Sequence, residues 1–263
     1  MTPDSNLIPL RIVDSPAASD VVLLHLADPR SCYAVRCENQ TALKAPGDLD
    51  VCFVPLKAGP LTLPAEGGDW LAAAPGHTLA IKLRGVEVLW RPGRAMLHCE
   101  AETADALLVA LAEFSHYEGE LRRIEAEVAH TWDELEQDSP LAFEVAPADL
   151  KRTSEVGQRM GRILQHRICA ARMEQHLYEA TPAIAGTAQK LAEELRERAR
   201  IEQRMEALDT QLEVAEGVYE MAAQRIGEFT AAHEGQRIEW IIIVLLGAEA
   251  ILMLFDVLMK HHH

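Results

Sequence analysis

The sequence predicts an α+β fold. A small N-terminal domain with a mixed or antiparallel sheet is followed by a long helical hairpin or coiled-coil stalk, and then by one C-terminal transmembrane helix. Three observations favour this order. Short apolar runs separated by Gly and Pro fill residues 21–101, helical periodicity begins near residue 103, and residues 240–259 are almost entirely apolar. Short bounded runs are typical of strands, and apolar residues three and four apart are typical of helices.

The chain divides at its changes of composition. The segments are a flexible lead-in rich in proline (residues 1–20), an α/β domain (21–136), a linker containing Pro140 and Pro147 (137–148), a helical stalk (149–236), the transmembrane helix (237–260) and three histidines that resemble a purification tag (261–263).

Strands are expected where β-branched and aromatic residues stand between turn signals. We predict them at residues 21–27, 31–38, 50–56 and 94–101, and residues 77–93 should form two strands around a tight turn at Arg84 and Gly85. A helix should then begin with Thr103 as its N-cap, and a second one at residues 149–180 should stop at Thr181 and Pro182.

The best periodic signal lies in the last part of the stalk. Apolar or aromatic residues alternate at spacings of three and four, as in the a and d positions of a heptad. This heptad seam comprises Met205, Leu208, Leu212, Ala215, Tyr219, Ala222, Ile226 and Phe229. It predicts either a hairpin with the preceding helix or a contact between copies of the chain.

Residues 240–259 would form a helix of roughly 30 Å, the thickness of the hydrocarbon core. Trp240 suits the membrane interface, and Gly247 permits close approach of another helix. Glu249 and Asp256 are seven residues apart, on one helical face. They indicate a polar contact between packed helices, part of an ion path, or tolerated neutral carboxyl groups. The alternative to a membrane span is a buried helix in an oligomer core.

The membrane reading implies lipid as a partner. Since residues 1–10 carry no signal peptide, it also implies a location in the inner membrane with the bulk of the chain in the cytoplasm. The net charge of −16 argues against direct nucleic-acid binding. Residues 1–100 hold 9 basic and 11 acidic residues, whereas residues 101–263 hold 16 and 30, so the helical half is the acidic half.

Chemical motifs are lacking in the sequence. The five cysteines form no CxxC pair, and no phosphate loop, GxSxG, HExxH or dinucleotide fingerprint occurs. His166 and His176 lie ten apart with Cys169 between them, which suggests surface or core histidines more than a metal site. Glutamates 113, 118, 120 and 125 are expected on a solvated helix face. We therefore expect no catalytic residues, no cofactor and no metal.

Three stretches carry a family resemblance: LRGVEVLWRPG (residues 83–93), ARIEQRMEALDTQLEVAEGVYEMA (199–222) and RIEWIIIVLLGAEAILMLFDV (237–257), with SCYAVRC (31–37) as a weaker match. They resemble the required-for-meiotic-nuclear-division family of mitochondrial proteins and their bacterial relatives. The resemblance implies a membrane-tethered protein without known catalysis. In mitochondria the family supports translation at the inner membrane.

Three functions follow as hypotheses. The first is a membrane-anchored homo-oligomeric scaffold or tether that links a cytosolic machine, such as the translation apparatus, to the membrane through a protein partner. The second is an ion channel or transport-related oligomer lined by the single span. The third is an enzyme with an unrecognised site in the N-terminal domain.

Overall fold

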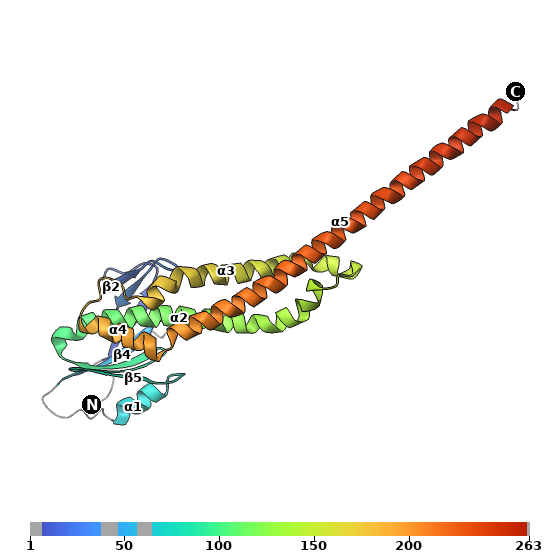
Figure 1. Cartoon of the computed structure of the whole chain (residues 1–263). Helices are drawn as coiled ribbons and strands as arrows, with labels where there is room; N and C mark the ends of the chain where they lie inside the picture. Colours follow the sequence, from blue (N-terminus) through green and yellow to red (C-terminus); the bar gives the residue numbers. More distant parts are fainter. Residues whose placement is uncertain (1–6, 38–46, 57–64, 262–263) are drawn as a thin grey trace. The chain divides into compact units, whose positions relative to one another are not determined.

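The computed structural model describes the backbone of residues 7–37, 47–56 and 65–261, and the side chains of these residues except 65–67 and 254–261. The chain folds as two compact units. Unit 1 comprises residues 1–130 and 165–212, and unit 2 comprises residues 131–164 and 213–263. Figure 1 shows the labelled elements coloured along the sequence.

Unit 1 contains a seven-stranded sheet in the order β2-β3-β1-β4-β7-β6-β5. The strands are β1 (Leu7–Val13), β2 (Val21–Leu26), β3 (Cys32–Arg36), β4 (Leu49–Pro55), β5 (Leu79–Leu83), β6 (Val86–Arg91) and β7 (Arg94–Cys99). Strands β4 and β7 pair in parallel, and the other neighbours pair antiparallel. The sheet is therefore mixed, and the predicted turn joins β5 to β6, with Gly85 at a φ of 77°.

Strand β1 was not expected, because residues 1–20 were predicted to be a flexible lead-in. Its residues lie between β3 and β4 in the sheet, and Leu10 is buried. Pro9 lacks an N–H group, yet its carbonyl accepts a hydrogen bond from the Cys37 N–H at 3.1 Å. The ladder thus continues past the proline that suggested a loop.

Helices α1 (Ala65–Ala72) and α2 (Ala101–Asp138) contact opposite faces of the sheet. Leu89 belongs to a cluster with Trp70 and Leu71 of α1. The next residue, Trp90, packs edge-on against Phe114 of α2, and its indole N–H donates to Ser115 at 2.8 Å. Neighbouring residues of a strand point to opposite faces, so this pair defines the two layers.

The remaining helices are α3 (Thr153–Tyr178), α4 (Thr187–Arg198) and α5 (Ile201–His261). Helix α2 begins at Ala101, so Thr103 lies inside the first turn and is not the N-cap. Its hydroxyl donates to the Glu100 carbonyl at 3.0 Å. The predicted linker contains the 3₁₀ helix Ser139–Ala142, and a second 3₁₀ helix, Pro147–Arg152, begins at its end, so α3 starts four residues later than predicted. Helix α3 ends at Tyr178, just before the predicted stop.

The heptad seam of α5 is buried within the chain. Met205, Leu208 and Leu212 face the interior of unit 1, and Tyr219 and Ile226 are buried in unit 2. Phe229 is half-buried. Of the two alternatives left open by the spacing, the structure therefore shows packing against helices of the same chain.

Among the residues described, no helix is both long enough and apolar enough to cross a membrane. The predicted transmembrane helix at residues 237–260 is therefore wrong, and so is the C-terminal inner-membrane anchor. The described side chains of the apolar run end at Met253. An 18-residue stretch ending there includes Arg237, Glu239 and Glu249, and charged groups are costly in hydrocarbon. These residues instead extend the 61-residue helix α5.

Candidate functional sites

The first candidate site is the C-terminal part of α5, where every described side chain from residue 231 to residue 253 is exposed. Within it, an apolar segment spans residues 238–253. Its large hydrophobic side chains are 50% to 70% exposed: Ile238, Trp240, Ile241, Ile242, Ile243, Val244, Leu245, Leu246, Ile251, Leu252 and Met253. Residues 240–246 are apolar on every side of the helix.

Three of the residues predicted to contact a membrane or another copy lie in this apolar segment. Trp240, Gly247 and Glu249 are all exposed, and no side chain of the described residues lies within 4 Å of a Cβ built on Gly247. Asp256 lies outside the described side chains. The segment therefore offers a surface for association, and the roles predicted for these residues stay predictions.

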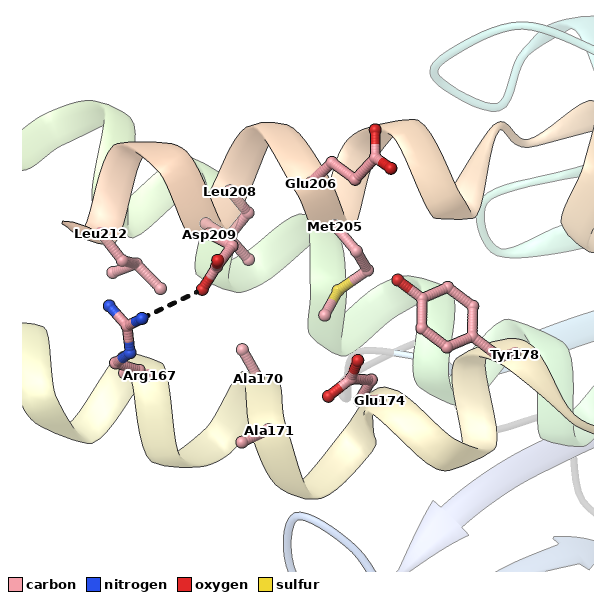
Figure 2. A pocket seen from close by; sticks show the side chains of 10 residues that line it. All are labelled: Arg167, Ala170, Ala171, Glu174, Tyr178, Met205, Glu206, Leu208, Asp209 and Leu212. Carbon is pink, nitrogen blue, oxygen red and sulfur yellow. Dashed lines mark ion pairs between the residues drawn. The ribbon is translucent and has the colours of Figure 1, made fainter. Parts of the chain in front are cut away.

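The second candidate site is a cleft of about 270 Å³ between α3 and α5 in unit 1. Figure 2 shows the side chains of α3 reaching toward those of α5 across it. Its lining, here called the Tyr178 cleft, is Arg167, Ala170, Ala171, Glu174, Tyr178, Met205, Glu206, Leu208, Asp209 and Leu212. Three residues of the heptad seam thus form part of its apolar floor.

Carboxylates surround the ring of Tyr178, which is 42% exposed. Burial raises the pKa of Tyr178, and the negative charges of Glu174, Glu202, Glu206 and Asp209 raise it further. Arg167 forms an ion pair with Asp209 at 3.4 Å (Figure 2). Among the described residues, Glu174 and Glu206 have no such partner, so the cleft has an apolar floor and a negative rim.

A smaller cleft of about 230 Å³ adjoins the first and shares Tyr178 with it. Its lining is Leu177, Tyr178, Arg196, Glu197, Ile201, Glu202 and Gln203. The guanidinium of Arg196 donates to Glu113 at 3.2 Å and to the carbonyls of His176 and Glu179. Its Nη1 is buried without a hydrogen-bond partner among the described residues.

The predicted solvated face of glutamates on α2 is wrong at two positions. Glu113 is completely buried and accepts hydrogen bonds from Thr181 and Arg196. Glu118 is 2% exposed and pairs with Arg122 at 2.5 Å and with Arg204 at 3.0 Å. Burial of charge requires such partners. Arg196 and Arg204 lie more than eighty residues further along the chain, where the local pattern of α2 gives no signal of them.

A cluster of aromatic and ionisable side chains joins the β2–β3 connection to α2 and α3. His176 stacks on Tyr117 with centroids 4.8 Å apart, and its Nε2 lies 3.5 Å from a carboxylate oxygen of Asp28. Arg172 pairs with the other oxygen at 2.9 Å. His166 instead lies 3.5 Å from Glu127, so the structure does not bring together the two histidines and the cysteine considered for a metal.

Over the described ranges, no group of three or more histidines, cysteines and acidic residues could hold a metal ion. The cysteines there are all free thiols, and burial raises the pKa of Cys32 to about 11. A buried thiol with a raised pKa is a poor nucleophile. Of the sites considered, the apolar segment and the Tyr178 cleft have the geometry of binding surfaces.

Comparison with protein-family models, with curated proteins and with solved structures finds no match for this chain. The resemblance to the required-for-meiotic-nuclear-division family is tested by none of these comparisons and stays a prediction.

Proposed function

We propose that the protein is a self-assembling scaffold in which the apolar segment of α5 joins copies of the chain. The observation that carries this proposal is the exposure of the apolar segment, whose eleven large hydrophobic side chains are all at least half exposed. At about 60–100 Å² for each large side chain, the apolar segment offers on the order of 1,000 Å². The largest exposed patch of a typical monomer is about 300–600 Å².

A second copy is the occupant that fits this area. A stable interface buries about 800 Å² on each partner, which the apolar segment can supply. Because residues 240–246 are apolar all round, one partner helix would leave part of this surface in water. Three or more copies, each with two neighbours, cover more of the circumference. The expected assembly is therefore a trimer or larger.

The experiment measures the mass of the purified full-length chain by analytical ultracentrifugation between about 1 and 50 μM, without detergent. An interface of standard size gives a dissociation constant near or below about 1 μM, so the wild type should be oligomeric across most of this range. The variant Ile242→Glu/Leu245→Glu places charges in the apolar segment and should sediment as a monomer.

The matched control is Val214→Glu/Met221→Glu. These residues are 47% and 46% exposed on the same helix but lie outside the apolar segment, so this variant should keep the wild-type mass. A monomeric wild type at 50 μM contradicts the proposal. So does a wild type that floats with phosphatidylcholine vesicles and stays monomeric without them, because lipid is then what the segment binds.

The hypothesis of an enzyme with an unrecognised site in the N-terminal domain is tested by no observation here. The two clefts described above are lined by residues of α3, α4 and α5, so they add no support to a site within residues 21–100.

A further inference from the structure

The Tyr178 cleft and its smaller neighbour adjoin at Tyr178, which lines both, and are here together called the groove. The two parts are about 270 and 230 Å³, so each has room for one long side chain. Met205, Leu208 and Ile201 supply buried apolar surface along α5. These side chains are at most 7% exposed, so an occupant meets an apolar floor through a small area of contact.

The charge around the groove is negative. Glu174, Glu202, Glu206 and Asp209 all act on Tyr178, and Arg167 neutralises Asp209 in part. Lysine and arginine side chains match this arrangement, since their aliphatic stems cover apolar surface while the charged ends reach carboxylates. The exposed ring of Tyr178 can also receive a cation over its face.

Arg196 adds a second requirement for the occupant, namely a hydrogen-bond acceptor. Its side chain is 9% exposed, it lines the smaller part of the groove, and its Nη1 has no partner among the described residues. Guanidinium groups only donate hydrogen bonds, so this nitrogen needs an acceptor. A polyamine offers cations without an acceptor, and a phosphate offers acceptors without a cation. A peptide with basic side chains offers both, because its backbone carbonyls accept.

We propose that this groove binds a short segment of a partner protein in which lysine or arginine stands beside apolar residues. The basic side chains lie against the rim on both sides of Tyr178, and the apolar ones cover the floor. Binding at the groove is separate from association through the apolar segment, which begins at Ile238. The proposal of peptide binding and the proposal of self-association can therefore be contradicted independently.

The test is a fluorescence-anisotropy titration of a labelled twelve-residue peptide of alternating leucine and lysine with the full-length chain. We expect a dissociation constant on the order of 10–100 μM, in the range of weak surface recognition. The variant Glu174→Gln/Glu206→Gln should weaken binding about five- to tenfold. Tyr178→Ala should weaken it by a similar factor, since the cation then loses its aromatic face.

The matched control is Glu102→Gln/Glu220→Gln, which makes the same change in net charge at exposed positions that do not line the groove. It should change the dissociation constant by less than about twofold, because exposed charges beyond the Debye length are screened. A peptide with glutamate in place of lysine should not bind.

Three outcomes overturn the proposal. The first is no binding of the basic peptide by the wild type. The second is an equal loss of affinity in both double variants, which would show non-specific attraction to an acidic protein. The third is displacement of the peptide by spermine at the same concentration, which would show that a small cation without an acceptor is sufficient. Circular dichroism of each variant verifies that its fold is intact.

Discussion

Carboxylates that are fully buried in the described part of this chain lie against arginines. Glu113 is held by Arg196, and Asp138, in unit 2, accepts hydrogen bonds from Arg152 and Arg159. Tyr219 also lies 3.4 Å from Asp138. Such pairs add little net stability over apolar packing, but removal of one partner leaves a buried charge alone.

Replacement of Glu113 by Ala should lower the free energy of unfolding by about 3–5 kcal/mol, because the buried Arg196 then lacks its counter-charge. Urea unfolding monitored by circular dichroism measures the change. The control is Glu194→Ala, which breaks an exposed pair with Arg198 and should cost under about 1 kcal/mol. Equal effects at the two sites would mean that Arg196 is solvated in the native protein.

His116 predicts a dependence of stability on pH. Burial lowers the pKa of His116 below its ordinary value of 6.5, although the Asp28 carbonyl and nearby glutamates oppose the shift. Well above pH 6.5 the side chain is neutral in both the folded and the unfolded state. As pH falls below 6.5 the unfolded chain takes up the proton first, so the free energy of unfolding should decrease.

The measurement compares urea unfolding at pH 7.5 and pH 5.5 for the wild type, His116→Gln and His77→Gln. The loss of stability on acidification should be smaller in His116→Gln than in the wild type. His77 is exposed, so its variant should follow the wild type. An unchanged slope in His116→Gln would assign the acid sensitivity to other groups.

At the scale of elements, the heptad seam determines how α5 packs. The residues of the seam are buried from Met205 to Ile226, whereas Val214 and Met221 on the outer side of the helix are exposed. The alternation of three and four residues was sufficient to predict this face. It did not decide between a partner in the same chain and a partner in another copy, because both bury the same stripe.

Replacement of Leu208 by Ala should cost about 2–3 kcal/mol, the lower part of the usual range, because Leu208 borders the Tyr178 cleft and the cavity left behind opens toward it. Val214→Ala on the same helix should change stability by less than about 0.5 kcal/mol. Thermal and urea unfolding both report the difference, and a cost at Val214 equal to that at Leu208 would mean that another surface covers Val214.

At the scale of the whole molecule, the sequence predicted what depends on local pattern. Most strands, the turn at Gly85 and the helical second half follow from spacing and turn residues. The choice between a mixed and an antiparallel sheet did not, because it depends on the parallel pairing of β4 with β7. Strand β1 was missed, because Pro9 within it and the other prolines of residues 1–20 suggested a loop, although it pairs with β3 and β4 further along the chain. The buried glutamates were missed for a related reason, since their arginines lie on α4 and α5.

The composition of the C-terminal end also led to a wrong prediction, that of a membrane span. Hydrophobicity and length favoured a membrane span, but hydropathy alone does not say which medium covers an apolar helix. The Tyr178 cleft could not be foreseen, because its rim combines α3 and α5, which are joined through α4. The only related feature of the sequence is the excess of acidic residues in the second half of the chain, which does not indicate where a cleft lies.

The continuity of α5 has a geometric consequence. No proline interrupts residues 201–261, and each residue advances an α-helix by about 1.5 Å and turns it by about 100°. Each residue added or removed after Phe229 would therefore rotate the whole apolar end against the seam. Addition of seven residues would nearly restore its angular phase, about 10 Å further out. In the proposed assembly, angular phase as well as hydrophobic content would then set which side chains one copy presents to the next.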